Sequence, residues 1–305
     1  EVLVIDDFST DNTASLVSSY TAQNIKLIPL KNFVPDNAIN SYKKKAIEIA
    51  VQQSTGDLIV TTDADCVVPK NWLQTIDAFY QEKNPSFIVM PVAINCGNSF
   101  IEIFQAVDFM ILQGITGASV YKKFHSMCNG ANLAYSRNAF NEVNGFKGIN
   151  NIASGDDMLL MHKIKKQFPG KATYLFSKDA IVSTPPMPDW KSFINQRIRW
   201  ASKATSYDDK KIFLVLLLVY FVNLVLLLLP LLSFFYAPLF HLWLTLLLFK
   251  IFVETIFMLP VATFFNQQKL LWWFPVMQPF HIAYTVVSGW LGKFGTYEWK
   301  GRNVK

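Results

Sequence analysis

Short apolar runs alternate with amphipathic segments over the first 200 residues. Several of the apolar runs end in acids or in turn-forming residues, as buried parallel strands do. Strand patterns cover residues 1–6, 25–28, 57–62, 87–92 and part of 172–184. Helical patterns cover residues 13–21, 45–53, 72–80, 101–114 and 190–203. This β-then-α order predicts an α/β domain with a mainly parallel sheet, covered by helices on both faces.

The pattern changes near residue 206. Residues 212–235 contain no charged side chain, and this run is longer than the roughly 20 residues that span a bilayer. Two further apolar segments follow at about 238–259 and 270–291. We therefore expect a soluble domain over residues 1–205 and a membrane domain over residues 206–305 with two to three transmembrane segments.

The third apolar segment is the least regular. It contains Pro275, Gln278, Pro279 and His281, and both prolines and polar groups at membrane depth need compensating partners. We expect this segment to be broken, either re-entrant or lying along the interface, and a kinked third span with the tail outside is the alternative. Lysines and arginine flank the spans and favour the cytoplasmic side at both ends of the membrane domain. These residues are Lys203, Lys210, Lys211, Lys293, Lys300, Arg302 and Lys305.

Composition and charge argue against a nucleic-acid-binding protein. The 305 residues are 51% hydrophobic with a net charge of +6. The sequence lacks the basic stripe with stacking aromatics that would indicate a nucleic-acid partner. Three widely spaced cysteines favour free thiols in a reducing compartment. The short run Lys43-Lys44-Lys45 is expected to form a solvated helix face. The chain begins at Glu1 inside a strand pattern, so we expect it to be a fragment that lacks its N-terminal part.

Two carboxylates, Asp63 and Asp65, follow the strand pattern at 57–62. In an extended segment alternate side chains point the same way, so these acids would lie side by side and repel each other. A hard divalent cation with oxygen ligands would relieve that repulsion. The pair therefore predicts a metal that clamps a phosphorylated substrate, and a solvated strand end is an equal alternative.

Other acids sit at turns. Asp6 and Asp7 follow the first strand, where they could accept hydrogen bonds from a nucleobase or a ribose, although a plain turn with a helix cap also fits. Asp156 and Asp157 follow Ser154-Gly155 and precede an apolar run. Asp157 could be a general base, or it could be an acid favoured by the helix dipole.

A polar face lies on the helix predicted at 190–203. Gln196, Arg199 and Trp200 are spaced i, i+3 and i+4, so they share one face, and an amide, a guanidinium and an indole suit a diphosphate beside a sugar. Anchoring at the membrane interface is the alternative. Lys250 and Glu254 lie four residues apart in the second apolar segment, and we expect them to form a neutralised structural pair.

The order of these motifs resembles that of the membrane-bound family 2 glycosyltransferases, which include cellulose, hyaluronan and poly-N-acetylglucosamine synthases and ceramide glucosyltransferases. The matching stretches are VIDDFSTDN, TTDADC, NGANLAYSR followed by VNGF, SGDD and QRIRW, which together run from Val4 to Trp200.

The resemblance implies a GT-A-like, Rossmann-related nucleotide-sugar domain and assigns roles to its motif residues. Nucleotide-sugar binding falls on Asp6, Asp7, Lys45, Asp63, Asp65, Gln196 and Arg199. By the same resemblance, Asp65 and Asp63 bind Mg²⁺ or Mn²⁺, and Asp157 is the catalytic base. Trp200 and Asp156 bind the acceptor. Two departures stand out: the family's first strand and helix are absent, and the usual Gly-Lys-Ala reads Lys44-Lys45-Ala46.

The implied activity is metal-dependent, inverting transfer of a sugar from a nucleotide-diphosphate sugar to a lipid or polysaccharide acceptor. The implied location is the inner membrane, with the catalytic domain in the cytoplasm and the bilayer as a partner. A catalytically inactive scaffold subunit of an envelope glycan complex is the alternative, and a transporter is a more distant one.

Overall fold

The structure is a computed structural model that describes residues 1–20, 24–35, 39–124, 127–152, 155–203, 209–299 and 302–304. The chain divides into two compact units. The first comprises Glu1–Thr62, Phe79–Val89 and Cys128–Thr173, and the second comprises Asp63–Ala78, Met90–Met127 and Tyr174–Lys305. These two units are not divided at residue 205, where the composition of the chain changes. The domain boundary at residue 205 stays a prediction.

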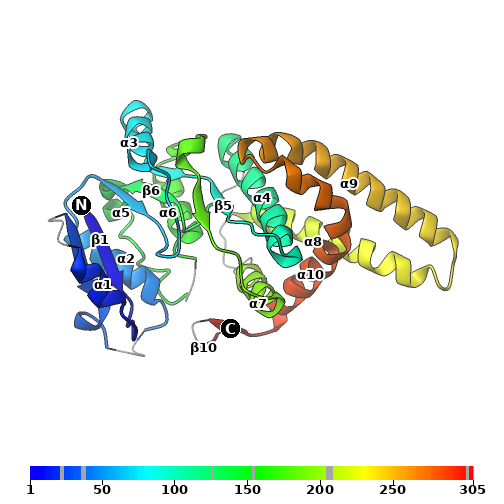
Figure 1. Ribbon diagram of the computed structural model, residues 1–305, viewed down its shortest axis with the longest axis horizontal. Helices are drawn as coiled ribbons and strands as arrows, with labels where there is room; N and C mark the ends of the chain where they lie inside the picture. Colours follow the sequence, from blue (N-terminus) through cyan, green and yellow to red (C-terminus); the bar gives the residue numbers. More distant parts are fainter. Residues whose placement is uncertain are drawn as a thin grey trace. The chain divides into compact units, whose positions relative to one another are not determined.

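The first unit begins with a parallel β-α-β arrangement, as predicted (Figure 1). Strands β1 (Val2–Asp6) and β2 (Ile25–Pro29) pair in parallel, with helix α1 (Thr13–Ser19) between them in the chain. A 3₁₀ turn, η1 (Leu30–Asn32), and helix α2 (Tyr42–Gln53) follow. Apolar side chains of these elements form one buried core, which consists of Ile28, Leu30, Val34, Tyr42, Ala46 and Ile49 with Leu3 and Ile5 packed against it.

The second sheet corrects the expectation of a mainly parallel arrangement. Its order is β3 (Leu58–Thr61), β6 (Leu133–Ser136), β4 (Phe87–Val89) and β7 (Ala172–Tyr174), and β6 is antiparallel to both β3 and β4. The β6 strand lies within the motif NGANLAYSR and was not expected to be a strand. An apolar run indicates that a strand is buried but carries no information about its direction, so the reversal could not be found from the pattern.

The remaining elements of the first unit are helices α5 (Arg137–Glu142) and α6 (Met158–Gln167). Helix α3 (Trp72–Lys83) begins in the second unit and ends in the first. The strand predicted at 87–92 is interrupted at Met90-Pro91, and a separate strand, β5 (Val92–Ile94), follows. Proline has no backbone N–H to donate to a sheet, which explains the interruption.

The second unit is mainly helical. Strands β5 and β8 (Val182–Thr184) pair in parallel, and a 3₁₀ turn, η2 (Lys178–Ala180), precedes β8. The helices are α4 (Phe100–Tyr121), α7 (Trp190–Ala201), α8 (Lys210–Leu232), α9 (Pro238–Phe264) and α10 (Phe274–Phe294), with a 3₁₀ turn, η4 (Gln268–Trp273), before α10. The chain closes with an antiparallel hairpin of β9 (Tyr297–Trp299) and β10 (Arg302–Val304). Side chains of α4, α7 and α10 share one apolar core, which includes Phe104, Val107, Phe193, Phe274 and Met277.

Three helices among the described residues are long and apolar enough to cross a membrane: α4, α8 and α9. This assignment rests on length and composition. The apolar stretch of α4 is 67% buried within the protein, whereas those of α8 and α9 are only 22% and 6% buried. Figure 1 shows α8 and α9 running side by side and joining at their far end. These two helices therefore present apolar side chains outward, where a bilayer could cover them.

The third apolar segment differs from the expectation. It folds as η4 followed by a continuous helix α10, with Pro275 near the helix start and Pro279 in the helix interior. Helix α10 is not among the described helices that meet the length and hydropathy requirement for a span. Its re-entrant or interfacial placement in a membrane stays a prediction. Of the tail, Lys300, Gly301 and Lys305 lie outside the described residues.

Candidate active site

The first acid pair lies where β1 ends. Asp6 is buried, and its Oδ1 accepts a hydrogen bond from the Ser9 amide at 3.0 Å. Between them, Phe8 has a left-handed backbone with φ of 58°. Asp6 thus holds a tight turn, and Asp7, the next residue, is half-buried. The plain turn that also fits this motif is present, and nucleotide binding by Asp6 and Asp7 stays a prediction.

The lysine run on α2 is not a solvated face, which corrects the expectation. Lys44 is 2% exposed, and its ammonium donates to the carbonyl oxygens of Ile149 at 2.8 Å and Ile152 at 2.6 Å. Lys43 forms an ion pair with Asp156 at 3.3 Å, and Lys45, the candidate donor ligand, pairs with Glu48 at 3.0 Å. Three consecutive residues point about 100° apart around a helix, so they reach three different environments.

The second acid pair lies at the start of α6. Asp157 is the N-cap residue: its Oδ1 accepts from the Met158 amide at 2.7 Å, and its Oδ2 accepts from the Gly130 amide at 3.1 Å. Asp156 lies beside it, with a mostly buried side chain. The capping alternative is therefore realised in the fold. Each carboxylate oxygen has two lone pairs, so the cap leaves acceptor capacity for a proton.

The Asn129-Gly130 segment packs closely against these acids. A Cβ built on Gly130 would lie 3.2 Å from Lys43 Nζ and 3.3 Å from Asp156 Oδ2. A side chain at residue 130 would therefore displace charged groups of this cluster. Tyr135 of β6 is buried in the same unit, and burial raises the pKa of its phenol, with a further rise from the Asp156 carboxylate. The structure thus gathers Lys43, Asp156 and Asp157 around Gly130.

The Asp63–Cys66 segment belongs to the second unit and corrects the geometry that we expected. These residues form a turn, closed by a hydrogen bond from the Cys66 amide to the Asp63 carbonyl at 3.1 Å, and not an extended strand end. Asp63 is half-buried and Asp65 is exposed. The simple alternation that we used to place both carboxylates on one side therefore does not apply here.

The donor chemistry of this turn still suits a hard cation. Asp63 and Asp65 supply carboxylate oxygens, and Mg²⁺ is commonly bound through one or two carboxylates together with substrate phosphates. Among the described residues there is no group of three or more His, Cys, Asp or Glu side chains that could hold a metal alone. Burial raises the pKa of the adjacent Cys66 thiol, and the Asp65 and Asp63 carboxylates raise it further.

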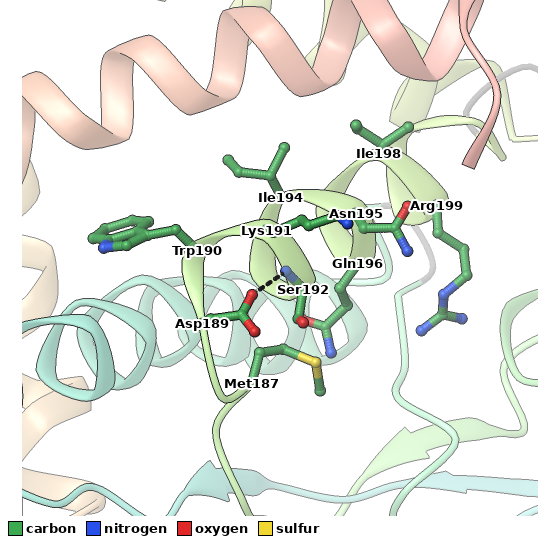
Figure 2. A pocket seen from close by; sticks show the side chains of 10 residues that line it. All are labelled: Met187, Asp189, Trp190, Lys191, Ser192, Ile194, Asn195, Gln196, Ile198 and Arg199. Atoms are coloured by element: carbon green, nitrogen blue, oxygen red, sulfur yellow. Dashed lines mark hydrogen bonds between the residues drawn. The ribbon is translucent and has the colours of Figure 1, made fainter. Parts of the chain in front are cut away.

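A cavity of about 990 Å³ opens along α7 in the second unit. Gln196 and Arg199 both line it, with Met187, Asp189 and Ser192 nearby (Figure 2). Figure 2 shows these side chains on one side of the helix, and it also shows the hydrogen bond from the Ser192 amide to Asp189 Oδ1, which measures 2.7 Å. Hydrogen bonding with Ser192 lowers the pKa of Asp189, the N-cap of α7.

Trp200, the third member of the expected face, does not line this cavity. The Trp200 ring lies against Phe109 of α4, with 6.2 Å between ring centroids, and the guanidinium carbon of Arg197 lies 4.3 Å from the centroid of the Trp200 ring. Residues at i and i+4 diverge by about 40° around a helix, which is enough to turn Trp200 toward protein. The Trp200 ring is half-buried. Its role in acceptor binding stays a prediction.

A buried polar cluster escaped the sequence analysis. Asp108 of α4 accepts from Arg197 Nη2 at 2.7 Å, from His281 Nδ1 at 3.2 Å and from the Tyr284 hydroxyl. Asp108 and Arg197 are 3% and 5% exposed. The available signal is Asp108 in the middle of the apolar pattern at 101–114, because a buried acid needs a partner of opposite charge.

The pairing of Lys250 with Glu254 is confirmed, at 2.7 Å. Gln278 of α10 completes the group: its Oε1 accepts from Lys250 at 2.7 Å, and its Nε2 donates to Glu254 at 3.1 Å. The three side chains satisfy one another, which explains how two charges are tolerated in an apolar helix.

Comparisons with known proteins give one family match and several similar solved structures. Residues 1–143 match the family model described as glycosyl transferase family 2, and no curated protein matches the chain. Among solved structures, S. aureus TarS has 17% identity and a TM-score of 0.43, covering 73% of this chain and 37% of that one. TarS 1-349 in complex with UDP-GlcNAc has 16% identity and a TM-score of 0.44, covering 99% and 86%.

Glucosyl-3-phosphoglycerate synthase from Mycobacterium tuberculosis, in complex with phosphoglyceric acid, has 12% identity and a TM-score of 0.38, covering 60% of this chain and 58% of that chain. The chain spans little more than a third of the longest of these relatives. The family match contains the motifs around Asp6, Asp7, Lys45, Asp63 and Asp65, so residues 1–143 are similar in sequence to glycosyl transferase family 2 domains.

Proposed function

We propose that this chain is a metal-dependent, inverting glycosyltransferase with a GT-A-like domain. It moves a sugar from a nucleotide-diphosphate sugar to a lipid or polysaccharide acceptor at the cytoplasmic face of the inner membrane. The observation that carries this proposal is the glycosyl transferase family 2 match over residues 1–143. The acids and the lysine that the family resemblance assigns to the donor all lie within that match.

Donor binding is assigned to the two acid pairs and to Lys45. Asp7 accepts hydrogen bonds from the nucleoside while Asp6 holds the turn, as its bond to Ser9 supports. Asp65 and Asp63 hold Mg²⁺ or Mn²⁺, which, when bound, supplies positive charge that stabilises the departing diphosphate. Lys45 contributes a further positive charge, for which it must exchange its contact with Glu48.

The chemical step is assigned to Asp157. A carboxylate oxygen of Asp157 removes the proton from the acceptor hydroxyl, and the hydroxyl oxygen attacks the anomeric carbon of the donor sugar. The bond from that carbon to the diphosphate breaks with its electron pair staying on the diphosphate. A single displacement inverts the configuration at the anomeric carbon. The hydrogen bonds from Gly130 and Met158 support the role by fixing the orientation of the carboxylate.

The remaining assignments concern the leaving group and the acceptor. Arg199 and Gln196 donate to the diphosphate, which is supported by their common place in the cavity beside α7. A guanidinium can grip phosphate with two parallel hydrogen bonds. Trp200 and Asp156 support the acceptor. Helices α8 and α9 anchor the enzyme in the bilayer, as their outward apolar surface supports.

Product analysis tests the proposal. The full-length protein in nanodiscs is incubated with a panel of nucleotide sugars and Mn²⁺, and the products are identified by mass spectrometry. We expect one donor to yield a glycosylated lipid or glycan, with Asp65→Asn as the inactive control. Absence of both transfer and nucleotide-sugar hydrolysis across the panel would favour an inactive scaffold subunit of an envelope glycan complex. The observation that favours this alternative is that both Asp157 oxygens already accept backbone hydrogen bonds, from Met158 at the start of α6 and from Gly130.

The membrane topology has its own test. The basic tail is expected on the cytoplasmic face, so a single cysteine introduced at Asn303 should not react with an impermeant maleimide added to intact cells. Reaction from outside would place the tail on the opposite face from the catalytic domain.

A further inference from the structure

The guanidinium of Arg197 connects the buried cluster to the cavity beside α7. Its Nη2 donates to Asp108 Oδ2 at 2.7 Å, and its Nη1 donates to Gln196 Oε1 at 2.8 Å. Gln196 lines the cavity, whereas Arg197 does not. One flat group therefore joins a fully buried carboxylate of α4 to an amide at the wall of the cavity.

Arg197 has little freedom to move. Its guanidinium carbon lies 4.5 Å from the Phe193 ring centroid and 4.3 Å from that of Trp200, so aromatic rings restrain it. Asp108 is itself fixed by two groups of α10, His281 and Tyr284. The five N–H donors of a guanidinium lie in one rigid plane. The hydrogen bond from Nη2 to Asp108 therefore also fixes the direction of Nη1, which donates to Gln196.

The polarity of the Gln196 amide follows from this contact. Arginine only donates hydrogen bonds, so the oxygen of the amide must face Arg197. The described residues offer Gln196 Nε2 no hydrogen-bond partner. The amide therefore presents its two N–H donors, and not its oxygen, to the cavity, where a ligand rich in acceptor oxygens fits.

We propose that Arg197, held by Asp108, is a positioning residue that fixes Gln196 with its N–H donors toward the cavity, and that these donors meet the diphosphate oxygens of the donor substrate. This inference rests on the proposed function. It also implies that His281 and Tyr284 of α10, which hold Asp108, help to fix the orientation of the Gln196 amide. An ion pair between Arg197 and Asp108 that only stabilised the fold would not require the second hydrogen bond, from Arg197 Nη1 to Gln196.

Binding of UDP and GDP to the full-length protein in nanodiscs, measured by calorimetry with Mn²⁺, tests the assignment. Arg197→Lys should weaken the tighter nucleotide by about tenfold, because one ammonium cannot serve Asp108 and Gln196 together. Gln196→Glu should weaken binding by at least as much as Gln196→Ala, because the carboxylate keeps the acceptor for Arg197 but removes the donors. Retained affinity in Gln196→Glu would overturn the assigned polarity.

The decisive comparison is the double variant Arg197→Lys/Gln196→Ala. If Arg197 acts through Gln196, the double variant should bind no more weakly than Gln196→Ala alone, and the KM for the donor should follow the same pattern. Additive losses would show a general structural effect and overturn the proposal. Glu254→Gln is the matched control, because it neutralises a partly buried charge of the same unit without touching Gln196, and its affinity should be unchanged.

Failure of the proposed function gives a different result. If the unaltered protein binds neither nucleotide, the donor assignment fails, and the contact is then tested by thermal melting alone. Losses of melting temperature in Arg197→Lys and Gln196→Ala should again be less than additive, because both remove the same hydrogen bond. Strictly additive losses of melting temperature would show that Arg197 and Gln196 do not interact.

Discussion

The substitution Asp157→Asn separates catalysis from helix capping. In the structure both carboxylate oxygens of Asp157 accept backbone hydrogen bonds, from Met158 at 2.7 Å and from Gly130 at 3.1 Å. Asparagine caps helices about as well as aspartate, so its amide oxygen can keep the bond to Met158. The amide nitrogen would then face the Gly130 N–H, and two donors cannot bond.

The magnitudes follow from those two contacts. Loss of the Gly130 bond, with a donor left facing a donor, should cost about 1–2 kcal/mol of unfolding free energy. Asp157→Ala loses both bonds and should cost about 2–3 kcal/mol. Domains are typically stable by about 5–15 kcal/mol, so Asp157→Asn stays almost entirely folded. Loss of a positioned base, in contrast, lowers turnover by about 10²–10⁴-fold.

The assay is turnover of the full-length enzyme at saturating donor, with thermal melting of the same preparations. We expect turnover of Asp157→Asn to fall by orders of magnitude while its melting temperature drops by only a few degrees. Asp156→Asn is the matched control for the melting temperature, because it makes the same charge change one residue away and leaves both backbone bonds of Asp157 in place. Turnover of Asp157→Asn within about threefold of the unaltered enzyme would be incompatible with a base and would leave Asp157 as a cap.

Three other outcomes are expected. Asp65→Asn should abolish the Mn²⁺ dependence of nucleotide affinity measured by calorimetry, and an unchanged dependence would remove Asp65 from the site. Lys44→Met should lower the unfolding free energy by about 2–4 kcal/mol, because two buried carbonyl groups lose a charged donor, whereas Lys45→Met, at a surface pair, should cost less than about 1 kcal/mol. In thermal melting, Lys250→Met and Glu254→Gln should each destabilise, and the double variant should lose less than their sum, since either single change leaves a charge uncompensated. Purely additive losses would contradict that pairing.

The sequence alone determined what depends on neighbours along the chain. Periodicity located β1, β2, α2, α3 and α7, because burial of one face of a helix or strand imposes a local repeat. A long uncharged run located α8, because such a run is long enough to cross a bilayer as a helix. The Lys250–Glu254 pair was also predictable, since four residues of helix bring two side chains together without help from the rest of the fold.

Only the tertiary structure decided what depends on residues far apart in the chain. The reversed direction of β6, the burial of Lys44 under the 149–152 carbonyls and the turn at Asp63–Cys66 have no local signature. The clearest case is Arg197, which a helical wheel cannot distinguish from Arg199. Asp108, 89 residues earlier in the chain, neutralises Arg197 inside the protein. Arg199 stays at the cavity. Burying a guanidinium requires a carboxylate partner to offset its lost hydration, and only the folded chain determines which arginine receives that partner.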